Sequence, residues 1–341
     1  MTVQSTPSAV CLFAGGFPLI DPHLPMIDLH RHLDGSVRLE TVLDLGLKHN
    51  IPLPATTLEE LRPFVHVTEP QGGLLSYFKK FKWMTAILAD CDACRRVAYE
   101  NVEDAAREGI DYIELRFSPF FMAETFSLDP NAVVEAVIDG VQAGQRDFHT
   151  PANLIGILSR NYGERSWGEL ETLLHYRQHL TAIDLAGDEI HFSGELFVEQ
   201  FKKVRDAGLH ITIHAGEATG PASVWQAIDQ LGAERIGHGI TAAQDPALMD
   251  YMLGKGIGIE SNLTSNLHTS LIDSYLSHPL RIFLQHGLKA TLNTDDPGIS
   301  AVYLRHEYET AAPAAGLTPE QIRQAQKNAL EIAFLSQNDK A

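Results

Sequence analysis

A repeated unit of helix, glycine and short strand constrains the fold of this chain more than any other feature. The unit is clearest in four places, where a helical pattern ends in glycine and a β-rich run follows: DAAREG–IDYIELRFSP, KKVRDAG–LHITIHAGE, YMLGKG–IGIESN and FLQHG–LKATLNTDD. A glycine directly after a helix supplies the left-handed turn that ends it. Since strands that alternate with helices pair in parallel, the pattern predicts an α/β fold with a parallel sheet.

Eight such strands are expected along the chain, and eight parallel strands with intervening helices favour a closed (β/α)8 TIM barrel. The expected strands cover residues 26–31, 110–117, 153–159, 182–187, 210–215, 235–239, 256–261 and 288–294. An open doubly wound sheet is the alternative, and the absence of a glycine-rich dinucleotide fingerprint weakens it. The segment 33–109 is far longer than one crossover needs, so it predicts extra helices that pack on the core or cover the barrel mouth as a lid.

Within the 341-residue chain, residues 1–24 are expected to form a loosely attached N-terminal extension and residues 25–341 a single barrel domain. The apolar stretch 8–20 lacks the preceding Lys or Arg of a signal peptide. No apolar run approaches the ~18 residues that a membrane span needs. Cys91 and Cys94 form a C-x-x-C inside a helical pattern, without a second pair to complete a zinc site. These features predict a cytoplasmic protein with reduced cysteines.

The charge of the chain limits its partners. The formal net charge of -18 argues against binding to nucleic acid or to anionic membranes. It is compatible with a small neutral or cationic ligand.

Polar residues follow the expected strands at the end where barrel enzymes carry their active sites. These residues are His30, His32, Arg116, Ser118, Ser159, Arg160, Asp188, Glu189, His214, Glu217, His238, Ser261, Asn262, Asp295 and Asp296. His30 and His32 lie two residues apart, so a strand places both on one face, about 6.6 Å apart along the backbone. With His214 and one Asp they would supply the three or four ligands that a zinc ion takes.

Two adjacent acids, Asp295 and Asp296, close the run LKATLNTDDPGIS. Adjacent carboxylates repel each other and resist burial, so their placement at the end of a core strand needs a reason. Successive side chains of a strand point to opposite sides, so we expect the two acids to have different roles. Asp295 would face a cation, which offsets its charge. Asp296 would be protonated, because a dry pocket and its charged neighbour both raise its pKa.

Seven motifs resemble those of the adenosine deaminase family of metal-dependent hydrolases, over residues 25–335: LHRHLDGS, ELRFSP, IDLAGDE, HAGEATGP, RIGHG, LTSN and NTDDPG. The resemblance implies one zinc ion per chain, with a ligand set of His30, His32, His214 and Asp295. It implies that Glu217, His238 and Asp295 are catalytic, Glu217 as the proton shuttle and His238 as the residue that orients and deprotonates the metal-bound water. The implied substrate contacts are His32, Asp34, Gly187 and Asp296.

The implied reaction is the zinc-dependent hydrolytic deamination of adenosine, and of 2′-deoxyadenosine, to inosine and ammonia. Bound zinc lowers the pKa of water from 15.7 toward roughly 7, and the resulting hydroxide attacks purine C6. Glu217, kept protonated in a dry pocket, would give its proton to N1. Gly187 either lets the backbone approach the purine or is an ordinary turn glycine. Asp34 either accepts from a ribose hydroxyl or is an acid near a helix N-terminus.

Three other functions stay open. The nearest is deamination of free adenine, although relatives of that type tend to carry Glu where this chain has Asp34. A binuclear amidohydrolase would usually carry a bridging Lys after the fourth strand, where this chain has DLAGDE. A barrel kept only for binding would be expected to lose metal-binding and acidic residues that are all present here. The expected partner is therefore a small purine nucleoside, and the sequence leaves the oligomeric state open.

Overall fold

The computed structural model describes residues 19–336 and residue 340, so most of the expected extension 1–24 lies outside the described residues. Its described part, residues 19–24, runs beside helix α17 (Pro319–Ile332). There the side-chain oxygen of Gln326 accepts the backbone N–H of Asp21 at 2.9 Å, and its amide nitrogen donates to the carbonyl of Leu24 at 2.9 Å. Leu19 is buried in the core.

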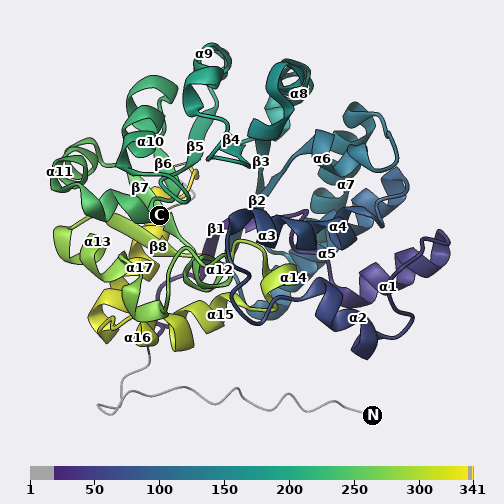
Figure 1. The fold of residues 1–341 in the computed structure, drawn as a ribbon, viewed down its shortest axis with the longest axis horizontal. Helices are drawn as coiled ribbons and strands as arrows, with labels where there is room; N and C mark the ends of the chain where they lie inside the picture. Colours follow the sequence, from purple (N-terminus) through teal and green to yellow (C-terminus); the bar gives the residue numbers. More distant parts are fainter. Residues whose placement is uncertain (1–18, 337–339, 341) are drawn as a thin grey trace.

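Eight parallel strands follow one another around the sheet in chain order (Figure 1). They are β1 (Ile27–His32), β2 (Tyr112–Phe117), β3 (Ala152–Ser159), β4 (Ala182–Ala186), β5 (His210–Ala215), β6 (Arg235–His238), β7 (Gly258–Ser261) and β8 (Lys289–Leu292). Each strand lies where the repeated unit predicts it, with ends that agree within two residues. The predicted α/β barrel is confirmed.

The glycines of the repeated unit have the conformation that the sequence predicts. Gly109, Gly208, Gly256 and Gly287 all have φ angles between 71° and 89°. They follow α5 (Cys91–Glu108), α9 (Val198–Asp206), α11 (Pro246–Lys255) and α13 (Leu280–His286). Each glycine therefore turns the chain from a helix into the next strand.

Extra helices fill the long connection between β1 and β2, as predicted. They are α1 (Leu39–Lys48), α2 (Leu58–Val65), α3 (Leu74–Tyr77), the 3-10 turn η1 (Phe78–Lys80), α4 (Phe81–Thr85) and α5. Cys91 and Cys94 lie on α5, and the second of them is buried.

The other helices surround the barrel (Figure 1). They are α6 (Pro119–Glu124), α7 (Pro130–Phe148), α8 (Ser166–His175), α10 (Pro221–Gln226), α12 (Leu263–His268), α14 (Pro297–Ser300), α15 (Leu304–His306) and α16 (Ala312–Ala314), besides α9, α11, α13 and α17. Within the residues described, none of these helices combines the length and apolarity that a membrane crossing requires.

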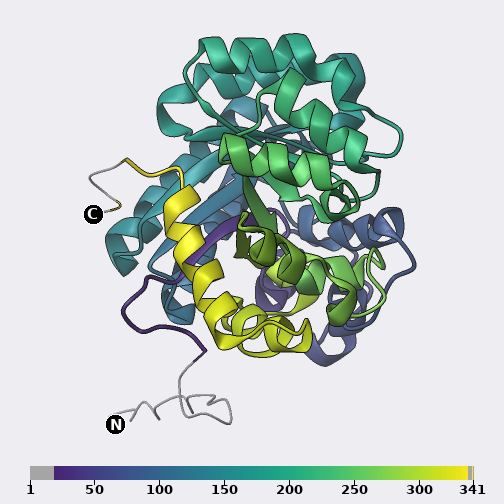
Figure 2. The same cartoon turned by 90° about the vertical axis from the view of Figure 1, so that its left-hand side faces the viewer.

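The barrel closes through very few contacts between its first and last strands. One isolated bridge joins Arg31 to Asp295. Around it, the N–H of His32 donates to the carbonyl of Asp295, and the N–H of Asp295 donates to the carbonyl of His30, both at 2.8 Å. Helix α17 packs against both β8 and β1 and so covers this seam, as the yellow helix in Figure 2 shows.

The barrel interior contains buried charges. Along β2, Ile113 and Leu115 belong to the apolar core, whereas Glu114 and Arg116 alternate with them and point to the other side. The guanidinium of Arg116 donates to Asp184 at 2.9 Å and to Glu260 at 2.8 Å. This buried, paired layer lies directly beneath the polar strand ends.

Candidate active site

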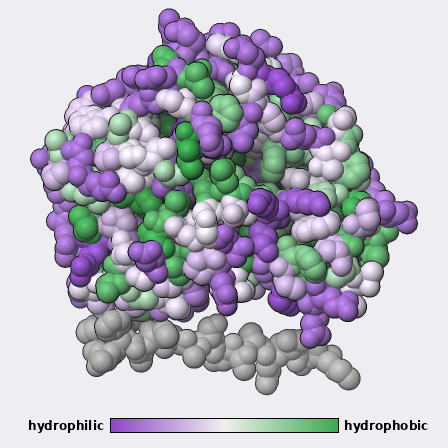
Figure 3. Space-filling view, in the orientation of Figure 1, coloured by the Kyte–Doolittle hydropathy of each residue, from purple (hydrophilic) through white to green (hydrophobic). Residues whose placement is uncertain are grey.

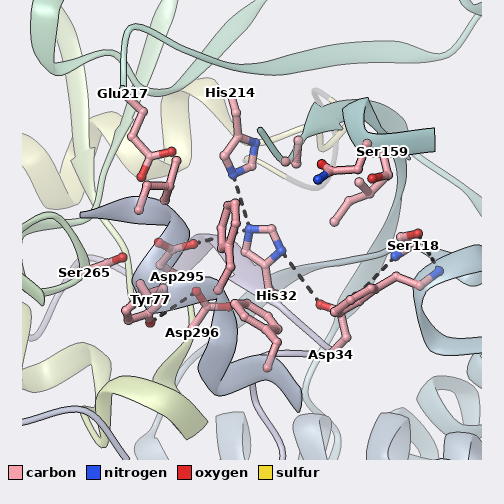
Figure 4. Close-up of a pocket in the computed structure, with 18 of the residues that line it drawn as sticks. His32, Asp34, Tyr77, Ser118, Ser159, His214, Glu217, Ser265, Asp295 and Asp296 are labelled. Atoms are coloured by element: carbon pink, nitrogen blue, oxygen red, sulfur yellow. Dashed lines mark hydrogen bonds and ion pairs between the residues drawn. The ribbon is translucent and has the colours of Figure 1, made fainter. Parts of the chain in front are cut away.

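The carboxyl ends of the strands surround a cavity of about 270 Å³. Eight of the nine predicted site residues line it: His32, Asp34, Gly187, His214, Glu217, His238, Asp295 and Asp296. The ninth, His30, is fully buried behind them. Apolar residues gather around the hollow at the centre of this face (Figure 3), and Figure 4 shows His214, His32 and Asp34 in succession across the cavity. The structure therefore brings the predicted residues together at one place.

Three imidazoles and a carboxylate form a compact buried group. The Nε2 atoms of His32 and His214 lie 3.3 Å apart. The Oδ1 atom of Asp295 lies 3.2 Å from His30 Nε2 and 3.3 Å from His32 Nε2. Two ligands of a tetrahedral zinc ion, each about 2.1 Å from the metal, are themselves separated by about 3.3–3.4 Å. These side chains have the spacing and the donor types of a zinc site.

Two further carboxylates set the orientation of the imidazoles. Glu260 on β7 lies 2.7 Å from Nδ1 of His30, and Asp184 on β4 lies 2.9 Å from Nδ1 of His214. With Nδ1 engaged, each ring turns Nε2 toward the shared centre, as carboxylates behind metal-binding histidines do. Nε2 of His30 is buried and faces Oδ1 of Asp295, which is 3.2 Å away.

The charge states of these rings also suit a metal. Burial and the neighbouring imidazoles hold the pKa of His32 well below its ordinary value, and burial lowers the pKa of His214. Burial lowers the pKa of His30 as well, but its hydrogen bonds to Asp295 and Glu260 outweigh this effect and raise the pKa overall. Metal ligation requires neutral imidazole, and the lowered pKa values of His32 and His214 favour that form.

His238 lies at the edge of this group. Its ligand atoms lie within 4.8 Å of those of His30, His214 and Asp295. Its Nε2, however, lies 3.8 Å from the other oxygen of Asp295, Oδ2, which is longer than the spacing between His32 and Oδ1. Its backbone has a φ of 62°, which is strained for a residue with a β-carbon. His32 thus lies closer than His238 to Asp295, whereas His238 lies closer to the group formed by His30 and His214.

A chain of amide and imidazole groups, which the sequence did not indicate, holds His238. The side-chain amides of Asn262 and Asn266 lie 3.3 Å and 3.0 Å from its Nδ1. The other end of Asn266 lies 3.2 Å from His278, whose Nδ1 accepts the backbone N–H of Leu280 at 3.0 Å. Burial lowers the pKa of His238 well below its ordinary value. The ring is therefore fixed in place and neutral.

Glu217 is a buried acid next to His238, with its Oε1 3.6 Å from Nδ1 of that ring. Burial raises the pKa of Glu217 well above its ordinary value, and the charges of Asp295 and Glu189 raise it further. The raised pKa favours the protonated form of the carboxyl group, which is the form that a proton donor needs.

The two adjacent aspartates occupy different surroundings, but the expected reason is wrong. Strand β8 ends at Leu292, and Asp295 has a left-handed φ of 63° in the loop beyond it. A turn of the backbone, not strand alternation, therefore separates the two side chains. Asp295 meets the histidines, while Asp296 lies near Tyr77, whose hydroxyl donates to its Oδ2 at 3.3 Å.

The pKa values of the pair diverge accordingly. Burial alone would raise the pKa of Asp295, but the imidazoles of His238 and His30 around it bring it well below its ordinary value. Burial and the charge of Asp295 raise the pKa of Asp296 well above its ordinary value. The absence of a side chain at Gly35 makes room for Asp296, because a β-carbon there would lie 1.9 Å from its Oδ1.

Asp34 and Gly187 lie on the substrate side of the cavity. Asp34 is 3.9 Å from Nδ1 of His32 and accepts the backbone N–H of Ser118 at 3.4 Å, and burial raises its pKa to about 7. Gly187 has a φ of 109°, and a β-carbon there would lie 2.3 Å from the Asn161 side chain. Both the conformation and the space at this position therefore require glycine.

Four aromatic side chains form the opposite side of the cavity, which we call the aromatic wall: Tyr77, Phe78, Phe81 and Phe121. The ring of Phe81 lies 5.8 Å from that of Phe121 and 6.2 Å from that of Phe78. Sequence reasoning missed these residues individually. For Tyr77, Phe78 and Phe81 the signal was their place in the segment 33–109, which we expected to pack on the core or to cover the barrel mouth. Phe121 lies outside this segment, on α6.

Comparison with known proteins identifies the family. The sequence profile described as adenosine deaminase matches residues 25–341. The chain is similar to the adenosine deaminase of Klebsiella pneumoniae, with 59% identity over 95% of this chain and 97% of that protein. It is also similar to the adenosine deaminase of Yersinia pseudotuberculosis, with 57% identity over 94% of this chain and 97% of that protein.

Solved structures share the fold. An adenine deaminase from Arthrobacter aurescens superposes with a TM-score of 0.86 at 24% identity, over 93% of this chain and 96% of that one. An amidohydrolase from Burkholderia ambifaria, solved with bound zinc, has a TM-score of 0.84 at 26% identity, over 93% and 87%. On the evidence of its sequence, this chain belongs to the adenosine deaminase family.

Proposed function

We propose that the chain catalyses the zinc-dependent hydrolytic deamination of adenosine, and of 2′-deoxyadenosine, to inosine and ammonia. The observation that carries the proposal is the juxtaposition of a buried three-histidine, one-aspartate group with a buried protonated acid, Glu217, in one cavity. The adenosine deaminases to which the chain is similar support the choice of substrate.

One zinc ion per chain would be held by His30, His32, His214 and Asp295. Three of the distances among them, His32–His214, His30–Asp295 and His32–Asp295, have the length expected between ligands of a tetrahedral ion. Zinc makes water acidic enough to provide hydroxide near neutral pH. Asp184 and Glu260 keep the imidazoles oriented for this purpose.

Glu217 and His238 would move the protons. His238 is neutral and fixed, so it can orient the attacking water and accept its proton. As the water oxygen bonds to purine C6, electron density moves to N1, where the carboxyl of Glu217 supplies a proton. The proton held by His238 would then pass to the amino group, which leaves as ammonia, while the hydroxyl on C6 would return its proton to the Glu217 carboxylate as the carbonyl of inosine forms.

The other side chains would bind the nucleoside. Asp296, protonated, would donate to N7, because N7 is an acceptor. The backbone N–H at Gly187 would approach a ring nitrogen, and Asp34 would accept from a ribose hydroxyl. Among the described residues that line the cavity there is no Lys or Arg, so the site suits a neutral nucleoside.

The remaining expectations belong to the same proposal. We infer a cytoplasmic enzyme that binds a small purine nucleoside and neither nucleic acid nor a membrane, because the chain is strongly acidic. Residues 25–341 would form its single domain.

A metal-depletion assay tests the proposal. Removal of zinc with a chelator should abolish conversion of adenosine to inosine, followed by absorbance, and stoichiometric zinc should restore it. Adenine offered at the same concentration should react far more slowly. Full activity with negligible metal content, or faster turnover of adenine, would contradict the proposal.

A further inference from the structure

The loop that carries Glu217 is fastened to a second acid on the neighbouring strand end. The carboxylate of Glu189 accepts four consecutive backbone N–H groups of residues 216–219. One oxygen accepts from Gly216 at 2.7 Å, and the other accepts from Glu217 at 3.2 Å, Ala218 at 2.8 Å and Thr219 at 3.2 Å. Glu189 itself is buried.

All four of these hydrogen bonds to the Glu189 carboxylate come from one loop. Successive N–H groups that converge on one anion form a concave nest, in which Gly216 has a left-handed φ of 64°. Hydrogen bonds to an ionised carboxylate are roughly twice as strong as those between neutral groups. Within the described part of the chain, no Lys, Arg or His lies at ion-pair distance from Glu189, so these N–H groups are its polar partners.

Glu189 also links the loop to the opposite part of the cavity. It lies two residues after Gly187, and the intervening Asp188 donates its backbone N–H to Asn161 at 3.0 Å. The carboxylate therefore ties the end of β4, with Gly187, to the end of β5, with Glu217. Glu189 does not line the cavity. A substitution of Glu189 would therefore alter the position of Glu217 without replacing a residue of the cavity lining.

We propose that Glu189 is a positioning residue that holds the carboxyl group of Glu217 at the reacting end of the purine. The inference rests on the proposed role of Glu217 as the proton donor at N1. Displacing a catalytic group by about 1 Å can cost about 10²-fold in rate. The structure assigns that control to one buried carboxylate and its four backbone partners.

The test compares Glu189→Gln with a matched control, Glu195→Gln. Glu195 follows in the same segment, is exposed, and forms no hydrogen bond or ion pair with residues 216–219. Glu189→Gln keeps the size of the side chain but places an NH₂ group against backbone N–H donors. We expect its kcat per bound zinc to fall about 10–100-fold, with KM changed less than about threefold. The control should match the wild type, and Glu189→Asp, which keeps the charge, should recover part of the loss.

A double-mutant cycle separates positioning from general damage. If Glu189 acts through Glu217, then Glu189→Gln should cost less than about threefold in a Glu217→Gln background. An equal loss in both backgrounds, an unchanged kcat, a rise in KM alone, or loss of zinc from both Glu189 variants would overturn the inference. The proposed function fails separately, if the zinc-loaded wild type does not deaminate adenosine or if Glu217→Gln retains full activity.

Discussion

The two sides of the cavity are built in different ways. The metal side comes from strand ends, and a second carboxylate fixes two of its imidazoles: Glu260 fixes His30 and Asp184 fixes His214. The aromatic wall comes from short helices in the long β1–β2 connection and from α6. The centroids of its neighbouring rings lie 5.8–6.3 Å apart. The barrel therefore supplies the polar and charged groups of the cavity, while the inserted segment and α6 supply its aromatic surface.

This difference predicts which measured quantity each substitution changes. Residues on the metal side should control metal content and kcat. Residues of the aromatic wall should control KM and leave both of those nearly unchanged. Substitutions at four positions test this division, in order of decreasing expected effect.

The largest effect is expected for Asp295→Ala. Asp295 lies within 3.3 Å of two imidazole nitrogens, so its removal takes away a ligand and the charge that offsets the cation. Zinc and activity should disappear together, as measured by metal analysis and an adenosine assay on one preparation. A variant that keeps zinc would remove Asp295 from the ligand set.

Glu217→Gln should have the next largest effect. The amide keeps the shape of the side chain but cannot transfer the proton, so kcat should fall by about 10²–10⁴-fold while zinc content is retained. The raised pKa of Glu217 also predicts a pH dependence. The wild type should keep its kcat at neutral pH and lose it as the pH rises through that pKa, because ionisation removes the proton. An alkaline limb that survives unchanged in Glu217→Gln would contradict this assignment.

Asp296 offers a graded comparison. Asp296→Asn keeps a hydrogen-bond donor, whereas Asp296→Ala removes it. We expect the alanine variant to lose about 10–100-fold in kcat/KM, since an unmet hydrogen bond to a buried group costs about 1–3 kcal/mol. The asparagine variant should lose less, and both should keep zinc. If Asp296→Ala sheds zinc and Asp295→Ala keeps it, the two roles are reversed.

The smallest effect is expected in the aromatic wall. Phe81→Ala removes a ring that contacts Phe78 and Phe121, and KM should rise about tenfold because about 1.4 kcal/mol of apolar contact is lost. Zinc content should be unaffected and kcat nearly so. Leu75→Ala, at a position that is 43% exposed in the same helical segment, serves as the control. A collapse of kcat in Phe81→Ala would end the distinction between the two sides.

The sequence predicted the metal side better than the aromatic wall, for a physical reason. The carboxyl ends of all eight strands meet at one face of a barrel. His30, His214 and Asp295 could therefore be placed together from the repeated unit alone. The position of Phe81 depends on how short helices pack after a long connection, which no local pattern specifies. The roles of Asp184 and Glu260 were missed for another reason. Nothing in the sequence shows that an acid within one strand faces a histidine on another strand.

The β8 end shows a further limit of sequence reasoning. Alternation along a strand predicted the separation of Asp295 and Asp296, and the separation is present. Its cause is the left-handed backbone at Asp295, a conformation that a non-glycine residue adopts only when its surroundings impose it. Such a local conformation could not be read from the residue types.

The seam between β1 and β8 has a consequence for how the protein is made. The bridge that joins the two strands involves Asp295 and the backbone of His30 and His32, which are also the proposed metal ligands. During synthesis, the histidines of β1 leave the ribosome early, whereas Asp295 emerges after most of the chain. A nascent polypeptide that ends before Asp295 therefore lacks one of the four proposed ligands, and a metal held by the full set would have to bind after this end of the barrel has been made.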